Sequence, residues 1–299
     1  MIKHINDAYK AAYPLSFRLS SRLVIMSDCH RGDGGWSDDF AKNQNIFFAA
    51  LTHYNQNAYT YIELGDGDEL WENRKFSDIS VIYNNVFWLM KKFHEDNRLY
   101  LIYGNHDIVK KYDPHIYDTY VDTEQKKNVP LFLGIQVHES ILLQNPETED
   151  RIFLLHGHQA DFFNDYMWKV SRFLVRYLWR PLEILGTNDP TSAAKNNKIK
   201  SQVEKHLRDF SEQEKVILIA GHTHRPVFPA AGEPAYFNDG SCVHPRCITA
   251  IEISEGCISL VKWCYMTRED GAVYIGREVL AGPEKISDYQ YTDPVVHAI

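Results

Sequence analysis

The sequence predicts a mixed α/β protein of the α+β kind. Short apolar runs typical of buried strands recur along the chain, at residues 23–26, 59–64, 99–103, 151–155 and 216–220. Segments with apolar residues at helical spacing separate several of these runs. Each run ends in a cluster of Asp, Asn or His side chains, so the predicted strands would carry polar groups at their ends.

The composition is that of a globular protein. The 299 residues are 44% hydrophobic, 24% charged and 13% aromatic, which is enough for a sizeable core. A net charge of −8 argues against a surface that binds nucleic acid throughout, so we expect no stable nucleic-acid complex. The five cysteines lack C-x-x-C spacing, which predicts reduced thiols in a cytoplasmic protein, and we expect a single domain over residues 1–299.

The first elements lead to a candidate chelating pair. Apolar residues at a 3.6 period predict a helix over residues 2–12, which Pro14 would end, and residues 23–26 form the first central strand. The strand runs into Asp28 and His30, and in an extended segment two such residues point to the same side. The alternative is an Asp that caps a turn beside a surface His.

The second strand ends in an acidic cluster. A loop over residues 31–38, which we expect to be flexible, and a helix over residues 39–54 precede the strand 59–64. This strand runs into Asp66, which has glycine on both sides, so the backbone could approach a ligand closely. The alternative is an acidic turn that is merely solvated.

The third strand ends in Gly-Asn-His-Asp. It spans residues 99–103 and follows a helix with a buried face near residues 79–93. Asn105 offers a neutral oxygen ligand, His106 a proton donor, and Asp107 a carboxylate that can orient the histidine.

The middle of the chain continues the pattern. Residues 113–130 are expected to be an irregular loop, and residues 135–143 and 151–155 two strands joined by a turn. The second of these strands ends in His156 and His158, on either side of a glycine. A turn is the simple interpretation, but imidazole is costly to bury without a partner, which favours a functional pair.

The helical spacing of apolar residues over 162–212 predicts a helical hairpin, inserted into the main fold as a cap. The spacing places four basic residues on one face of its first helix: Lys169, Arg172, Arg176 and Arg180. One interpretation is a solvated basic stripe on a helix whose other side is core. The other is a cap that holds an anionic, partly apolar substrate, or that contacts a membrane surface through residues 162–185.

The last apolar run, residues 216–220, is followed by His222 and His224, again two residues apart. Three further short strands predict an antiparallel β tail, over residues 236–240, 248–253 and 258–265. We expect the residues from Glu284 onward to form a loose tail.

The strand ends together supply nitrogen and oxygen donors from seven residues: Asp28, His30, Asp66, Asn105, His156, His222 and His224. Such a set suits a pair of borderline divalent metals such as Mn, Fe, Zn or Co, with one carboxylate free to bridge them. Two ions about 3.5–4 Å apart are the usual arrangement for displacement at phosphorus.

In order and spacing these motifs resemble those of the calcineurin-like metallophosphoesterase superfamily. The matching motifs are Asp28-x-His30, Gly65-Asp66-x-x-Glu69, Gly104-Asn105-His106-Asp107, His156 and Gly221-His222-x-His224. The resemblance implies a four-layer αββα metallophosphoesterase sandwich with a helical insert, in which two sheets lie face to face between helices and the metals lie at the strand ends.

The resemblance also implies roles for individual residues. The ligands would form three groups, with Asp28, His30 and His224 on the first metal, Asn105, His156 and His222 on the second, and Asp66 between them. His106 would help to bind and protonate the leaving oxygen, and Asp107 would orient it. A hydroxide formed near neutral pH would attack phosphorus in line.

Within the superfamily the chain is most similar in layout to the group that includes UDP-2,3-diacylglucosamine pyrophosphatase, which has a helical insert at the same place. That group typically has Arg where this chain has His106, and Asp where it has His158. We expect a small phosphorylated substrate, nucleotide-linked or lipid-like, that is cleaved at a phosphodiester or pyrophosphate bond. The alternatives are a phosphomonoesterase, a protein serine/threonine phosphatase, a nuclease, and a catalytically silent scaffold. The oligomeric state is left open.

Overall fold

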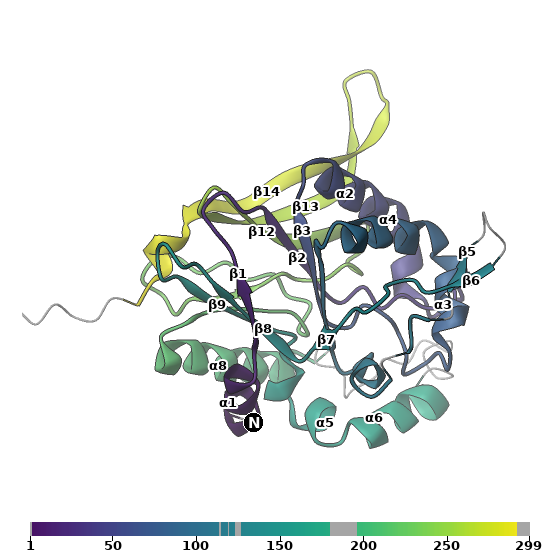
Figure 1. Cartoon of the computed structure of the whole chain (residues 1–299), viewed down its shortest axis with the longest axis horizontal. Coiled ribbons are helices and arrows are strands. Elements are labelled where there is room, and N and C mark those ends of the chain that lie inside the picture. Colours follow the sequence, from purple (N-terminus) through teal and green to yellow (C-terminus); the bar gives the residue numbers. More distant parts are fainter. Residues whose placement is uncertain (1, 114, 119, 123–126, 180–195, 292–299) are drawn as a thin grey trace, which may run out of the picture.

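The computed structural model describes residues 2–113, 115–118, 120–122, 127–179 and 196–291. Two sheets lie face to face, and helices cover the outer face of each sheet (Figure 1). This arrangement confirms the four-layer sandwich that the sequence motifs predict.

The larger sheet holds the first three predicted strands. Its strand order is β14 (Val273–Lys285), β13 (Cys257–Thr267), β12 (Cys247–Ser254), β2 (Leu23–Met26), β3 (Thr60–Leu64), β4 (Leu99–Ile102) and β7 (Val137–His138). Strands β2, β3 and β4 pair in parallel, so their carboxyl ends meet at one edge of the sheet. Strands β12, β13 and β14 are antiparallel to one another.

The smaller sheet holds the other two predicted strands. Its strand order is β1 (Tyr13–Ser16), β8 (Ser140–Gln144), β9 (Arg151–Leu155), β10 (Ile217–Ala220) and β11 (Tyr236–Asn238). Strand β10 pairs in parallel with both β9 and β11, so the histidine clusters that follow β9 and β10 start from the same edge. A separate two-stranded ribbon pairs β5 (Tyr120–Asp122) with β6 (Lys127–Val129).

Helices complete the two outer layers. The principal ones are α1 (Ile2–Lys10), α2 (Gln44–Gln56), α3 (Phe76–Ile82), α4 (Asn84–Glu95), α5 (Phe162–Asp165), α6 (Trp168–Leu174) and α8 (Asn197–Glu214). Short 3₁₀ segments are η1 (Asp39–Lys42), η2 (Ile108–Lys111), η3 (His158–Ala160) and η5 (Ile286–Tyr289), and η4 (Val175–Trp179) is a π-helical continuation of α6.

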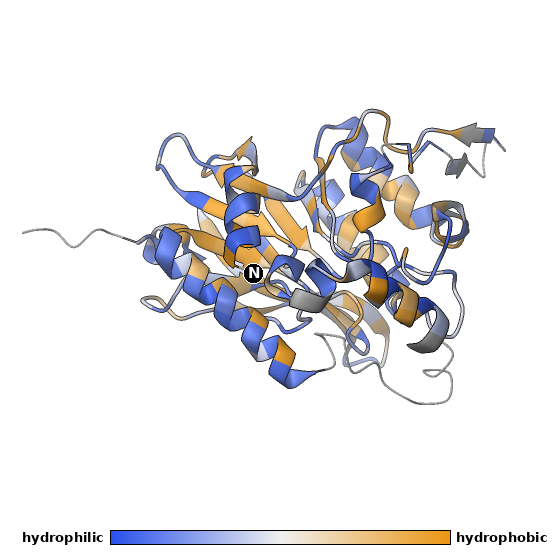
Figure 2. Cartoon of the chain, turned by 90° about the horizontal axis from the view of Figure 1, so that it is seen from below, coloured by the Kyte–Doolittle hydropathy of each residue, from blue (hydrophilic) through white to orange (hydrophobic). Residues whose placement is uncertain are grey.

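The core explains why the central strands are continuously apolar. In β2, Leu23 and Ile25 pack between the two sheets, whereas Val24 and Met26 pack on the other face with α2 and α4. Strands β9 and β10 alternate in the same way between the inter-sheet core and the layer beneath α1 and α8. Because both faces are buried, every position must be apolar. Figure 2 shows this concentration of hydrophobic residues in the strands.

Two predictions for the middle of the chain were wrong. Residues 135–143 are not one strand, because the chain leaves the larger sheet after β7 and enters the smaller sheet at β8. Loose alternation is the same for one strand and for two, so the sequence hid this crossover. Residues 113–130 contain the β5–β6 ribbon as well as irregular loop.

The C-terminal region also differs from the prediction. Strand β11 belongs to the smaller sheet rather than to the antiparallel tail, and strand β14 was missed. Residues beyond Glu284 are not loose at first, because β14 continues to Lys285 and the side chains of Ile286 and Tyr289 are buried in the inter-sheet core.

The loop over residues 31–38 was expected to be flexible, and both of its ends contradict this. The side chain of Arg31 is fully buried. At the other end the Asp38 carboxylate accepts hydrogen bonds from the backbone N–H groups of Gly32 and Gly34, at 3.2 and 2.8 Å. These bonds fix the turn that leads into η1.

The predicted insert contains α5, α6, η4 and α8. Helix α8 buries Val203, Leu207 and Phe210 against the outer face of the smaller sheet, as its apolar spacing predicts. Residues 180–185, including Arg180, lie outside the described residues, and the division into one domain with a cap over 162–212 stays a prediction. Among the described helices, none is long and apolar enough to cross a membrane.

Candidate metal centre

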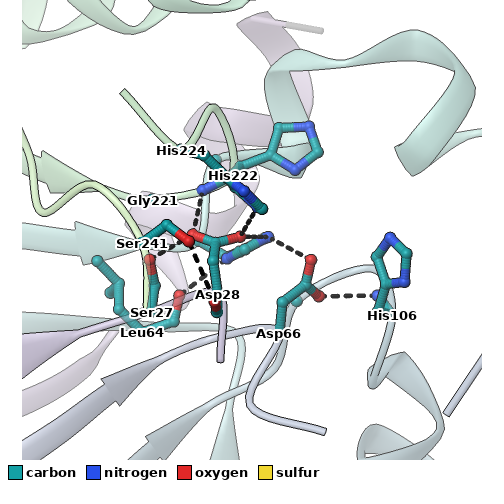
Figure 3. Close-up of polar contacts among 12 residues, drawn as sticks. Ser27, Asp28, Leu64, Asp66, His106, Gly221, His222, His224 and Ser241 are labelled. Atoms are coloured by element: carbon teal, nitrogen blue, oxygen red, sulfur yellow. Dashed lines mark hydrogen bonds and ion pairs between the residues drawn. The ribbon is translucent and has the colours of Figure 1, made fainter. Parts of the chain in front are cut away.

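Polar side chains from the loops that follow five buried strands lie close together. Figure 3 shows several of them, among them Asp28, Asp66, His222 and His224. Three groups of His, Asp and Glu residues lie there with potential ligand atoms within 4.8 Å of one another. Their members are Asp28, His30 and His224 in the first, Asp66, His156 and His222 in the second, and His30, Glu69 and His106 in the third. Six of the seven predicted ligands therefore fall into the first two groups.

The backbone turns sharply at most of the seven predicted ligands. Five of them have left-handed φ values between 47° and 66°: Asp28, His30, Asp66, His222 and His224. The prediction that Asp28 and His30 lie on extended backbone was therefore wrong, although both side chains reach the site. Left-handed backbone is strained for residues other than glycine, and such strain is concentrated at functional sites.

Asp28 directs one carboxylate oxygen into the first group. Its Oδ2 accepts a hydrogen bond from the backbone N–H of His222 at 2.9 Å and another from the Ser27 hydroxyl. Its Oδ1 lies 3.0 Å from His224 Nε2 and 3.7 Å from His30 Nε2. The carboxylate is thus held by one oxygen while the other faces two imidazoles.

Asp66 is arranged in the same way and contacts both groups. Its Oδ1 accepts a hydrogen bond from the backbone N–H of His106 at 2.8 Å. Its Oδ2 lies 3.1 Å from His156 Nε2 and 3.9 Å from His30 Nε2. One oxygen therefore lies near a member of each group, as a bridging ligand requires.

His156 presents a lone pair to the Asp66 carboxylate. Its Nδ1 lies 2.9 Å from the carbonyl oxygen of Leu64, so this nitrogen carries the proton and donates it. In the neutral ring Nε2 is then an acceptor, and it faces the Asp66 oxygen at 3.1 Å. Two acceptors this close repel each other unless a proton or a metal cation lies between them. With no metal bound, the proton is favoured, and the pKa of His156 is raised.

Three buried acceptor atoms support a cation at this place. Within the part of the chain that the structure describes, Asp28 Oδ1, Asn105 Oδ1 and His156 Nε2 have no hydrogen-bond partner. Buried polar atoms without partners are rare, and an ion or a water molecule usually satisfies them. Because the nitrogen and oxygen donors also match those preferred by borderline divalent metals, the residues present fit a metal centre.

Glu69 joins two histidines and was absent from the predicted site residues. Its carboxylate lies 2.9 Å from His30 Nδ1 and 2.7 Å from His106 Nδ1. Both rings therefore donate through Nδ1 to the same carboxylate, which turns their Nε2 atoms away from Glu69. The ring of Trp71 stacks on that of His106, with centroids 4.3 Å apart and planes inclined by 25°.

Asp107 does not orient His106, contrary to the expectation drawn from the motif. Its carboxylate accepts hydrogen bonds from the backbone N–H groups of Gly67 and Gly104, at 3.0 and 2.7 Å, and from Lys110 at 2.7 Å. It therefore fixes the loops that carry Asp66 and His106 rather than the imidazole. Glu69, rather than Asp107, contacts the His106 ring and orients it.

A buried ionic network lies behind the centre. Arg31 contacts Glu63 and Asp68 at 2.8 Å each, and Lys110 contacts Asp68 at 2.8 Å and Asp107 at 2.7 Å. All five side chains are buried. The network joins the loops that follow β2, β3 and β4, so it fixes their relative positions.

Burial and charge act in opposite directions on the site residues. Burial would raise the pKa of Asp66, but the charges of His156 and His106 outweigh it and lower that pKa. Burial would lower the pKa of His106, but the charges of Glu69 and Asp66 outweigh it and raise that pKa. For His156, the Asp66 and Asp28 charges outweigh burial in the same way and raise the pKa to about 9.

Two more residues lie beside the centre: Asp161, which the sequence did not single out, and His158, which it favoured as a functional partner of His156 without a ligand role. Asp161 Oδ2 lies 3.3 Å from His222 Nε2. His158 is buried beside His156, and burial with the charges of His156 and His222 holds its pKa well below the ordinary value. Asp161 had no sequence signal beyond its closeness to the His156 motif.

Glycine at position 104 is required by the close approach of Asp66. A Cβ atom on Gly104 would lie 2.1 Å from Asp66 Oδ1, which is far inside any contact distance. The strand end and the Asp66 carboxylate can therefore be this close only without a side chain at position 104.

Comparison with known proteins identifies one family. A model of the calcineurin-like phosphoesterases matches residues 21–226, which is more than half of the chain and includes all seven predicted ligands. One similar solved structure is a predicted phosphoesterase from Streptococcus pneumoniae TIGR4, at 14% identity and a TM-score of 0.35, covering 87% of this chain and 97% of that one. Another is Vps29 from Chaetomium thermophilum, at 10% identity and a TM-score of 0.41, covering 88% and 96%. No curated protein sequence matches the chain.

Proposed function

The chain belongs to the calcineurin-like phosphoesterase family, and from this premise we propose that it hydrolyses a phosphodiester or pyrophosphate bond at a centre of two divalent cations. The family supports a metal-dependent phosphoesterase. The bond type and the individual residue roles are our proposal.

The observation that carries the proposal is the contact between His156 Nε2 and Asp66 Oδ2 at 3.1 Å. Because His156 Nδ1 donates to Leu64, these two acceptors face each other without a proton unless the ring is charged. A cation held by both atoms would remove this repulsion, and the second Asp66 contact, to His30, supports a shared ligand. Bound there, two divalent ions would stabilise the charge on the phosphoryl oxygens and activate the attacking water.

We assign the metals on this basis. Asp28, His30 and His224 would hold the first ion, and Asp66 would be shared. His156 and His222 would hold the second ion, together with the buried amide oxygen of Asn105. Mn, Fe, Zn and Co all accept such ligands, so the identity of the metals is decided by measurement rather than by the donor set.

His106 would protonate the leaving oxygen. Glu69 fixes its Nδ1 at 2.7 Å and Trp71 stacks against its face, so the ring has one orientation and its Nε2 is the atom left for a substrate. The carboxylates of Glu69 and Asp66 raise the pKa of this histidine, which favours the protonated ring that a general acid needs. The nearby cations would act in the opposite direction and ease release of the proton.

A paired assay tests the proposed reaction. The purified protein is loaded with each of Mn, Fe, Zn and Co in turn and given an aryl phosphodiester and the matching aryl phosphomonoester. We expect a higher kcat/KM on the diester with at least one metal, and loss of that activity in Asp66→Asn. Asp270→Asn, in the exposed turn before β14, is the matched control.

Two results would contradict the proposal. A consistently higher kcat/KM on the monoester would favour the phosphomonoesterase or protein phosphatase alternative. An absence of turnover on both esters with every metal, in protein that binds two equivalents of ion, would favour a scaffold.

A further inference from the structure

A cavity of about 880 Å³ lies between the predicted insert and the loops beside the metal centre. One wall comes from α6 and η4, through Arg172, Arg176 and Tyr177. The opposite walls come from two segments that follow the site loops, residues 70–77 and 109–116. A volume of this size suits a small-molecule ligand.

The lining is strongly cationic. Arg74, Lys75, Arg172 and Arg176 line the cavity, against one carboxylate, that of Asp113. Within the described part of the chain, no ion pair joins any of these four cations to a carboxylate. The protein as a whole carries a net charge of −8, so this excess of positive charge is local. Four close cations repel one another unless an anion lies between them.

The positive charge of the lining also affects Arg176. Burial lowers the pKa of its guanidinium, and the charges of Arg172 and Arg74 lower it further. Arg176 is nevertheless held in place, because its Nε donates to the Trp71 carbonyl at 2.7 Å and its Nη2 to the Leu70 carbonyl at 3.1 Å. Arg176 therefore anchors the helix to the site loop. Arg172 and Arg74 are more available to a ligand.

Arg74 and Arg172 both line the cavity, and each is held by an aromatic residue. Arg74 Nη2 donates to the Tyr177 hydroxyl at 3.1 Å, and the Arg172 guanidinium lies 5.1 Å from the centre of the Trp168 ring. Both contacts leave guanidinium N–H groups for a further acceptor, and Arg binds phosphate through two such groups at once.

The cavity is next to the proposed reaction site. Leu70 lines it, and the following residue, Trp71, stacks on His106 with ring centroids 4.3 Å apart. Only the short stretch of Leu70 and Trp71 therefore separates the cavity from His106. Phe76 and Tyr177 add aromatic surface to the walls, on which a ring could pack.

We propose that this cavity binds a second phosphate group of the substrate, carried on a ring-bearing moiety beyond the scissile bond, with Arg172 and Arg74 as its main contacts. This inference rests on the proposed function, since it places the scissile bond at the metal centre. The bland alternative is a solvated basic face that binds nothing.

Two chromogenic substrates that differ by one phosphate test the inference. One is the 4-nitrophenyl ester of thymidine 5′-phosphate, and the other carries an additional 3′-phosphate. We expect the wild-type protein, loaded with its most active metal, to have the higher kcat/KM on the second compound. Arg172→Ala should reduce the ratio of the two kcat/KM values roughly tenfold, the value of a lost charge-assisted hydrogen bond.

Matched variants separate recognition from folding. Arg172→Lys should keep part of the preference because it keeps the charge, and Arg74→Ala is a second removal on a different segment. Arg268→Ala removes one exposed Arg from the turn of the β13–β14 hairpin, far from α6 in Figure 1, and should leave the ratio unchanged.

A binding measurement keeps the inference independent of turnover. Calorimetry compares the dissociation constants of thymidine 5′-phosphate and thymidine 3′,5′-bisphosphate on the metal-loaded protein. The inference requires tighter binding of the bisphosphate by the wild type and loss of that difference in Arg172→Ala and Arg74→Ala. Equal binding of both compounds by the wild type, or an unchanged difference in both variants, overturns it. If neither ester is hydrolysed, the proposed function fails, while calorimetry still decides for or against the phosphate site.

Discussion

The Nδ1 atom of His106 lies 2.7 Å from a carboxylate oxygen of Glu69. The same carboxylate is 2.9 Å from Nδ1 of His30. One buried carboxylate thus orients both the proposed general acid and a proposed metal ligand. The charges and hydrogen bonds of these two imidazoles outweigh burial and lower the pKa of Glu69 to about 2, so it remains ionised.

Glu69→Gln should therefore reduce both catalysis and metal affinity. The amide keeps the size of the side chain but removes the charge that both imidazoles contact. We expect kcat to fall roughly 10–100-fold, as for other groups that orient metal ligands. Kinetics together with metal titration measures the two effects. Glu95→Gln, on the exposed end of α4, is the control, and wild-type kcat and metal affinity in Glu69→Gln would contradict the role.

Replacement of His106 should impair the chemical step more than metal binding. His106→Ala should keep two equivalents of metal but lose turnover, and the loss should be smaller on esters with good leaving groups, which need little protonation. A series of aryl diesters of increasing leaving-group pKa measures this dependence. An equal loss across the series would count against the acid role.

Much of the site could be predicted from the sequence because parallel strands bring their carboxyl ends to one edge. The clusters after β2, β3 and β4 share one edge of the larger sheet, and those after β9 and β10 share one edge of the smaller sheet. The packing of the two sheets then brings these two edges together. Glu69 belongs to a matching motif, but its role was harder to predict, because it is one of three acidic residues in a row of five and its contacts depend on distant histidines. Only the fold shows that Asp68 points into the buried network with Arg31 and that Glu69 faces the histidines.

The fold was predictable for segments whose own residues indicate whether they are buried. The apolar runs of β2, β9 and β10 indicate burial on both faces, and the structure confirms it. Strand β14 was missed because most of its side chains are exposed, so it has little apolar signal and depends on pairing with β13. The crossover between β7 and β8 likewise depends on distant partners, because β7 pairs with β4 in the larger sheet and β8 pairs with β1 and β9 in the smaller sheet.

Asp66→Asn should remove the shared anchor of both ions. The amide has one ligand oxygen and no charge, so it cannot replace a bridging carboxylate. We expect the metal content to fall below two equivalents and turnover to be abolished. Elemental analysis of the purified variant measures the metal, with Asp270→Asn prepared in parallel. Two full equivalents with normal activity would show that Asp66 is not shared.

Membrane contact through residues 162–185 remains a prediction, and the described part of that segment has a surface suited to it. Val170, Phe173 and Tyr177 are exposed on α6 and η4, beside the basic Lys169. We expect the protein to sediment with anionic vesicles at low salt and Phe173→Asp to reduce this binding. Val273→Asp makes the same change at an exposed position of β14 and should have no effect. Wild-type protein that stays in the supernatant would exclude the contact under these conditions.

Loss of the buried cation at position 110 should destabilise the fold. The ammonium group of Lys110 lies 2.7 Å from Asp107 and 2.8 Å from Asp68, all three buried, so Lys110→Met would leave two carboxylates with too little positive charge. We expect the free energy of unfolding to fall by about 3–5 kcal/mol, the usual cost of breaking a buried pair from one side. Urea unfolding followed by circular dichroism measures this change.

The adjacent residue provides the control for this prediction. Lys111 contacts Glu139 at 3.4 Å, with both side chains about two-fifths exposed, so Lys111→Met should cost less than about 1 kcal/mol. The two variants remove the same charge one position apart in η2, and they differ mainly in the burial of the group that is lost. Because Asp107 also holds the loops of Asp66 and His106, Lys110→Met should lower kcat in protein that is still folded, whereas Lys111→Met should not. Equal unfolding free energies for the two variants would show that the network does not stabilise the site loops.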